Sequence, residues 1–168
     1  MERNNMLIIQ FIIVVVSVAA TAFIINKIEE DKFSRRISFK ETMDLLELPV
    51  ITMWYKNIKL HFLLDTGSNN CILTKEVADT LNLSNVGESE IYGLEGNTQS
   101  VYCAILDLTY HDHLFKDNYF QIVDMSQAFA RLKAESGLTI HGILGSRFMQ
   151  THKYVLDFDK LIASYKKK

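Results

Sequence analysis

The stretch Leu60-His61-Phe62-Leu63-Leu64-Asp65-Thr66-Gly67-Ser68 decides how this chain is interpreted. An apolar run ends abruptly in an acid, a hydroxyl residue, a glycine and a second hydroxyl residue. The apolar run is typical of a buried strand, and Gly67 permits a tight turn directly after it. We therefore expect Asp65 to lie where a strand leaves the core, on a rigid support.

Asp-Thr-Gly occurs once in the chain, because the other Asp-Thr pair, Asp79-Thr80, is followed by Leu81. An acid on such a support suits the chemistry in which two carboxyl groups about 3 Å apart share one proton, since both cannot ionise at that distance. One acid acts as base on a water molecule, and the other donates a hydrogen bond to the substrate carbonyl. With a single motif, the second acid most simply comes from another copy of the chain across a two-fold axis.

Three segments resemble elements of the retropepsin-like aspartic proteases. Leu63–Ser68, followed by Cys71–Leu73, is similar to the active-site strand of that family. Gly142–Gly145 resembles the family's apolar-apolar-Gly segment, which supports the active-site loop. Ile91–Gly96 falls where the family has its glycine-containing flap. The order, spacing and character of the three segments match, so the resemblance extends over most of residues 48–165.

The resemblance implies a fold and a set of site residues. The implied fold is mainly β, a closed, barrel-like retropepsin fold with short helices, here preceded by one transmembrane helix. The implied catalytic residues are Asp65, Thr66 and Gly67, and Ser68 stands where a hydroxyl could hydrogen-bond the carboxylate. The residues implied to bind substrate are Ser68, Gly93, Leu94 and Gly96.

Hydrophobic patterning predicts the elements between these motifs. Strands are expected over residues 50–55, 58–64, 71–73, 101–110 and 114–123, with a final hairpin over 154–165. Helices are expected over residues 75–83, 127–135 and 146–150, the last capped by Ser146. Lys56-Asn57 fits a two-residue hairpin turn, because Asn tolerates a positive φ.

The first segment, Met6–Ile25, is apolar except at Gln10, Ser17 and Thr21. About 20 such residues span a bilayer as a helix, and the segment lacks the polar face of a surface helix. A cleaved signal peptide is the rival interpretation, with a small-x-small site at Ala20-Thr21-Ala22. Because the apolar run continues past that site, we expect an uncleaved, single-pass anchor.

The anchor divides the chain into expected segments. These are a tail at 1–5, the membrane-spanning segment at 6–25, a juxtamembrane linker at 26–47, the protease-like domain at 48–165 and a basic tail at 166–168. Lys and Arg residues after the anchor favour a cytoplasmic domain. The short N-terminal tail before a signal-like segment favours an exported one, and we expect the domain on the extracytoplasmic side.

Composition excludes some classes of partner. The chain has 168 residues, 48% of them hydrophobic, and a net charge of −2, so nothing indicates a nucleic-acid partner. Cys71 and Cys103 could form a disulfide or remain buried thiols. His111-Asp112-His113 lacks the third protein ligand that catalytic zinc requires. We expect neither a metal nor a cofactor.

The expected function is that of a membrane-anchored aspartic endopeptidase, active as a homodimer on peptide or protein substrates. The alternative is a pepsin-fold peptide-binding or scaffolding module at the membrane that has lost proteolysis. Arg147 supports the alternative, because most cellular members of the family have Asp or Asn there, whereas the intact Asp65–Ser68 motif supports the enzyme. A third hypothesis is a membrane-tethered adaptor that acts through the helix near Phe129.

Overall fold

The computed structural model describes residues 2–33, 35–92 and 98–165, which separate into two compact units, 1–36 and 37–168. The first unit contains one long helix, α1 (Glu2–Phe33). Its segment Ile12–Glu29 is long and apolar enough to cross a membrane, and a signal sequence near an N-terminus would have the same properties. The first segment is therefore helical and apolar.

The second unit contains strands and short helices. In chain order they are β1 (Arg36–Ser38), α2 (Lys40–Leu46), β2 (Val50–Tyr55), β3 (Ile58–Asp65), β4 (Cys71–Thr74), α3 (Lys75–Thr80), β5 (Gly87–Tyr92), β6 (Thr98–Tyr110), β7 (His113–Val123), α4 (Ser126–Ser136), β8 (Gly142–Gly145), α5 (Ser146–Thr151), β9 (Val155–Asp157) and β10 (Ile162–Ser164). The expectation of a mainly β fold with short helices is confirmed.

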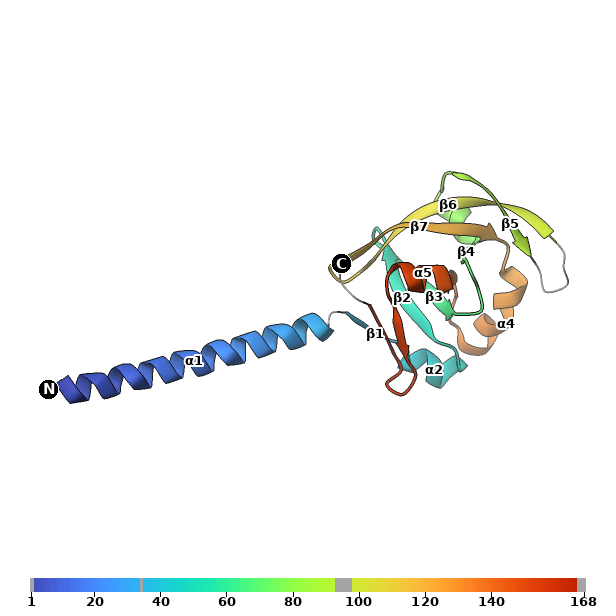
Figure 1. Cartoon of the computed structure of the whole chain (residues 1–168). Helices are drawn as coiled ribbons and strands as arrows, with labels where there is room; N and C mark the ends of the chain where they lie inside the picture. Colours follow the sequence, from blue (N-terminus) through green and yellow to red (C-terminus); the bar gives the residue numbers. More distant parts are fainter. Residues whose placement is uncertain (1, 34, 93–97, 166–168) are drawn as a thin grey trace. The chain divides into compact units, whose positions relative to one another are not determined.

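The main sheet has seven strands in the order β2-β3-β8-β4-β7-β6-β5. An additional pairing of Trp54 on β2 with Thr109 on β6 joins the two sides of this sheet, so six of its strands form a closed circuit of pairings. Figure 1 shows the long strands β6 and β7 side by side, with β5 along the outer side of β6. A separate sheet, β1-β10-β9, completes the unit.

Alternation along the strands builds the core. On β3, Leu60, Phe62 and Leu64 are buried, and the intervening side chains point to the other face. Phe62 meets Phe120 of β7, with 5.8 Å between ring centroids. Burying a large apolar side chain contributes about 1.5–3 kcal/mol, so the strand that ends in Asp65 is anchored at every second residue.

The segment expected as a linker, residues 26–47, is partly packed. α1 continues to Phe33, and Ile37 and Phe39 are 2% and 1% exposed. The backbone N–H of Phe39 donates to the carbonyl of Leu161 over 3.0 Å, next to the pairing of β1 with β10. Apolar side chains beyond residue 36 therefore belong to the core of the second unit.

Local details differ from the sequence-based expectations at chain reversals. In the β2–β3 hairpin the positive φ, +53°, falls on Lys56. α3 ends at Thr80, three residues before the expected end, and Leu81 and Leu83 still pack against the core. The residue that precedes α5 is Gly145, so Ser146 is the first residue of the helix and not its cap as expected.

Candidate active site

Asp65 is the last residue of β3, and its side chain is half-buried. β3 runs parallel to β8, with Phe62 opposite Gly142 and Asp65 opposite Gly145. β8 is also antiparallel to β4, so it lies between the strand before the Asp-Thr-Gly turn and the strand after it. The carboxylate is thus held at the end of a paired strand inside a sheet.

The turn after Asp65 is closed by the carboxylate itself. The backbone N–H of Gly67 donates to Asp65 Oδ1 over 2.8 Å, and the N–H of Ser68 donates to the Asp65 carbonyl over 3.3 Å. Within the described residues, Asp65 Oδ2 accepts no hydrogen bond. Thr66 and Gly67 are exposed. One carboxylate oxygen therefore positions the loop, and the other is available to a water molecule or a second acid.

Gly67 serves a different purpose from the one expected. Its φ is not positive, so backbone freedom does not explain the glycine. A Cβ added at this position would lie 3.2 Å from Asp65 Oδ1. The absence of a side chain at Gly67 therefore gives the carboxylate room beside the turn.

Gly142 and Gly145 allow the active-site loop and β4 to pass close to β8. A Cβ at Gly145 would lie 2.3 Å from the carbonyl oxygen of Asn70, and one at Gly142 would lie 2.3 Å from that of Ile72. The N–H of Ser146 donates to the Ser68 carbonyl over 2.8 Å, and the N–H of Arg147 donates to the Asn69 carbonyl over 3.2 Å. The start of α5 therefore fastens the loop that follows Asp65.

An apolar row lies beside Asp65 on the same face of the sheet. Ile143 on β8 is paired directly with Leu63 on β3 and with Ile72 on β4. Residues paired in this way share a face, and Leu63 shares it with Asp65, two residues further along the strand. Leu63 and Ile72 are half-buried. The sequence analysis did not identify this row, although counting back by twos from Asp65 would have found its first member.

The predicted site residues fall into two groups. Asp65, Thr66, Gly67 and Ser68 form one turn. The hydroxyl of Ser68 donates to the carbonyl of Asn70 over 2.8 Å and so stabilises the loop. The expected hydrogen bond from this hydroxyl to the Asp65 carboxylate is not formed. The other predicted substrate-binding residues, Gly93, Leu94 and Gly96, lie outside the described residues. Their hairpin is described as far as the pairing of Tyr92 with Thr98.

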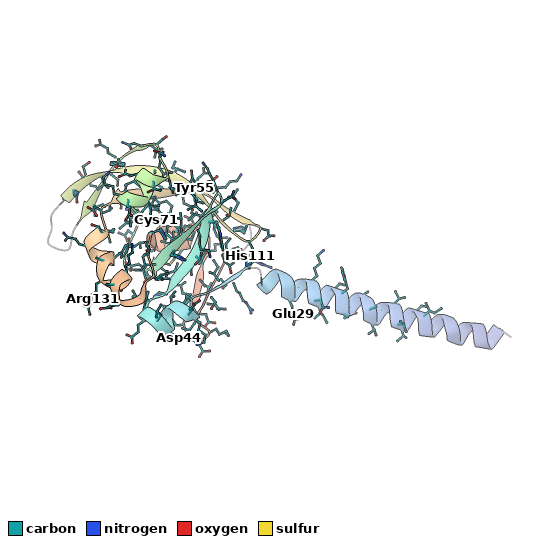
Figure 2. All side chains as sticks on the ribbon, turned by 180° about the vertical axis from the view of Figure 1, so that it is seen from behind. Glu29, Asp44, Tyr55, Cys71, His111 and Arg131 are labelled. Carbon is teal, nitrogen blue, oxygen red and sulfur yellow. The ribbon has the colours of Figure 1, made fainter. Side chains whose placement is uncertain are left out.

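Both cysteines are free and buried. Figure 2 shows Cys71 inside the domain, at the start of β4. Burial raises the pKa of the Cys71 thiol to about 11, and the nearby backbone of Gly145 and the charge of Arg147 offset only part of that shift. Cys71 is therefore a protonated core residue at neutral pH. In the described parts of the chain, no three His, Cys, Asp or Glu side chains form a group that could hold a metal ion.

Two histidines that are far apart in the sequence come together in the fold. The rings of His61 and His141 have centroids 5.4 Å apart, and the N–H of His61 donates to Nδ1 of His141 over 2.9 Å. The two residues are 80 positions apart in the chain. Only the parallel register of β3 with β8 brings them together, so no local signal could have predicted the pair.

A groove of about 390 Å³ lies at the end of β3 opposite to Asp65. α3 and α4 form its sides, and its lining includes Leu60, Val77, Phe129, Ile140 and His141. No side chain of α4 is fully buried. The groove is therefore separate from the Asp65 turn, and α4 packs only loosely beside it.

Comparisons with known proteins give a family and many similar solved structures. A search of curated proteins finds no match. The chain is similar to the solved structure of a retropepsin-like aspartic protease from Rickettsia conorii, with 22% identity, a TM-score of 0.45, and coverage of 69% of this chain and 80% of that chain. It is also similar to the retroviral protease-like domain of Ddi1 from Leishmania major, with 10% identity, a TM-score of 0.47, and coverage of 71% and 94%.

The family comparison includes the Asp65 turn and both glycines of β8. A family model described as aspartyl protease matches residues 51–148. This range covers more than half of the chain, from β2 through β8 and into α5. On that match, together with a half-buried aspartate at the end of a core strand, the chain belongs to the aspartyl protease family.

Proposed function

We propose that the protein is a membrane-anchored aspartic endopeptidase whose active site is completed by a second copy of the chain. The observation that carries the proposal is the Asp65 turn. One carboxylate oxygen of Asp65 accepts the Gly67 N–H, and the loop that follows is hydrogen-bonded to the start of α5. Such a support holds a catalytic acid in one geometry, as proton transfer and positioning of water require.

The need for a second chain follows from the chemistry. A carboxyl dyad shares one proton, so that one acid takes a proton from water while the other donates a hydrogen bond to the scissile carbonyl. The sequence has one Asp-Thr-Gly, and Thr66 and Gly67 are exposed in the single chain. Two such turns facing each other across a two-fold axis would place the two Asp65 side chains together and cover the exposed turns.

The apolar row beside Asp65 supports a preference among peptide substrates. Leu63, Ile72 and Ile143 lie next to the carboxylate on its own face of the sheet. Apolar side chains flanking the scissile bond would bury surface there, at roughly 25 cal/mol per Å². We expect cleavage between apolar residues of extended peptides, with Ser68 and the hairpin containing Gly93, Leu94 and Gly96 contacting the substrate.

The apolar part of α1 supports attachment to a membrane. Two copies confined to one membrane have a raised effective concentration, which favours pairing. We expect the domain on the extracytoplasmic side. Added protease tests this orientation in right-side-out membrane vesicles. An extracytoplasmic domain lies outside the vesicles and is digested, whereas a cytoplasmic domain lies in the lumen and survives.

The test is peptide cleavage by the full chain in detergent micelles, measured on a mixed peptide pool from pH 4 to 7.5. Asp65→Asn should lower turnover by roughly 10²–10⁴-fold while sedimentation still reports a folded dimer. Asp79→Asn is the matched control, since Asp79 is an exposed acid of α3 paired with Lys75. A wild-type dimer that cleaves nothing, or an Asp65→Asn variant with normal turnover, would contradict the proposal and favour the peptide-binding module.

A further inference from the structure

The histidine pair stands at the start of the parallel ladder that ends at Asp65. β3 and β8 pair from Phe62 opposite Gly142 to Asp65 opposite Gly145. His61 and His141 come one position before the first of these pairs. A disturbance at the histidines therefore acts on the same two strands that hold the Asp65 turn.

The hydrogen bonds of the pair define the protonation state of His141. Its Nδ1 accepts the backbone N–H of His61 over 2.9 Å. A ring nitrogen that accepts a hydrogen bond carries no proton, so His141 is neutral and has its proton on Nε2. The N–H of His141 donates to the His61 carbonyl over 2.8 Å. These two bonds join β3 to the residue that precedes β8.

The ring of His61 contacts a hydroxyl group, which can form a hydrogen bond with either the neutral or the protonated imidazole. Its Nδ1 lies 2.9 Å from the hydroxyl oxygen of Thr52, its cross-strand partner on β2. A hydroxyl can either donate or accept. Protonation of His61 therefore preserves its contact with Thr52, whereas protonation of His141 removes the acceptor on which the bond from β3 depends.

The charged groups around the pair come from three elements. Burial, followed by the charge of Lys59 on β3, lowers the pKa of His61. Burial and then the charge of the neighbouring His61 lower the pKa of His141, whereas a hydrogen bond with the His61 backbone raises it; Glu76 on α3 also raises it, and Lys133 on α4 lowers it. Lys75 and Asp124 line the same groove as His141. The groove gives solvent protons access to the ring, so His141 can titrate without unfolding of the domain.

We propose that His141 is a pH-sensitive latch, which in its neutral form holds β3 against the start of β8 and on protonation releases that end of the ladder. Protonation removes the acceptor for the His61 N–H and adds a cation beside the second imidazole. The loosened ladder supports the loop over Gly145 less firmly, so acid weakens the candidate catalytic turn. This consequence for activity rests on the proposed function, whereas the consequence for stability does not.

The sign of the effect follows from linkage. The pKa of His141 is lower in the folded chain than in the unfolded chain, so the unfolded chain binds more protons as the pH falls. The stabilisation is complete above about pH 6.5, the ordinary pKa of histidine, and is lost as the pH falls below that value.

The test compares urea unfolding midpoints of the full chain in micelles at pH 7.5 and 5.5. His141→Asn retains an acceptor oxygen near the position of Nδ1 but does not titrate. His111→Asn is the control, because His111 is exposed in the β6–β7 turn and its φ of +51° suits Asn (Figure 2). We expect the midpoints of the wild type and His111→Asn to fall with pH, and His141→Asn to lose at least half of that shift. An equal shift in all three proteins would overturn the latch.

Two further measurements keep the latch testable. If His141→Asn does not fold at pH 7.5, an NMR titration of the wild-type imidazoles decides: a His141 ring that protonates near pH 6.5 overturns the proposal. In peptide cleavage, the pH below which activity is lost should be lower for His141→Asn than for the wild type. If the wild type cleaves nothing at any pH, the unfolding midpoints still decide for or against the latch, and only the endopeptidase proposal fails.

Discussion

At the scale of the residue, Gly145 is where β8 passes close to the backbone of the loop that follows Asp65. A side chain there would meet the carbonyl oxygens of Asn70 and Ser68, at 2.3 and 2.7 Å. Both are backbone atoms of the loop that follows Asp65, so neither can rotate away. Gly145 is therefore required by close approach, and a change at this position acts directly on the Asp65 turn.

Gly145→Ala should destabilise the fold and lower turnover together. Forcing one extra carbon into a packed site typically costs about 1–3 kcal/mol, and here the loop itself must move. Urea unfolding and peptide cleavage measure the two effects. Ser146→Ala is the control, since the backbone N–H of Ser146 makes the bond to Ser68 and survives the change. A Gly145→Ala variant as stable and active as that control would show that the loop does not depend on this contact.

At the scale of the element, the β6–β7 pair contains a register shift that is stabilised by one side chain. The register shifts between Leu106 and Leu108, opposite Asn118 and Phe115. The buried Asn118 amide donates to the carbonyls of Leu106 and Phe115, at 2.9 and 2.6 Å. Its oxygen lies 2.8 Å from Nε2 of His152, just beyond α5. The Asn118 side chain thus provides hydrogen bonds to the carbonyl groups at the bulge and links the strand pair to the end of α5.

Asn118→Ala should lower the free energy of unfolding by about 1–3 kcal/mol, because it leaves buried carbonyls without their donor. The measurement is urea unfolding of the full chain at pH 7.5. Asn57→Ala, at an exposed turn position between β2 and β3, should stay within about 0.5 kcal/mol of the wild type. Equal effects of the two changes would mean that the bulge does not need the Asn118 amide.

At the scale of the whole molecule, the proposed endopeptidase shares its active site between two chains. Each copy would supply one Asp65, so a mixed dimer of wild type and Asp65→Asn has one acid and no dyad. With random pairing, only about a quarter of the dimers in an equal mixture are wild type on both sides. This arithmetic separates a shared site from one contained within a single chain.

Co-expression of the wild type with an equal amount of Asp65→Asn should therefore halve the cleavage activity per wild-type chain, to about 50%. Activity is measured on the peptide identified with the wild type alone, after quantifying both chains by mass spectrometry. Co-expression with Asp79→Asn, which retains Asp65, should leave the activity per active chain unchanged. An undiminished activity in the Asp65→Asn mixture would show that each chain acts by itself.

The fold could be predicted wherever the signal was local. The strand ending in Asp65 and the helix over residues 127–135 are read from neighbouring residues through hydrophobic patterning, and the Gly142–Gly145 segment from its resemblance to a family motif. Chain reversals were predicted less well. A positive φ fell on Lys56, and Gly145 took the place of Ser146 as cap. At both places the structure departs from the preference of the single residue.

The sequence by itself determined the candidate acid and its place at the end of a strand, because these depend on residues adjacent in the chain, and it indicated the family through short motifs in a matching order. Only the tertiary structure decided what surrounds that acid. The parallel register of β3 with β8 aligns Leu63 with Ile143, places Gly145 under the loop and brings His61 to His141. Register is set by the burial of alternate side chains along whole strands. It therefore brings together residues 80 positions apart whose local sequences do not predict the contact.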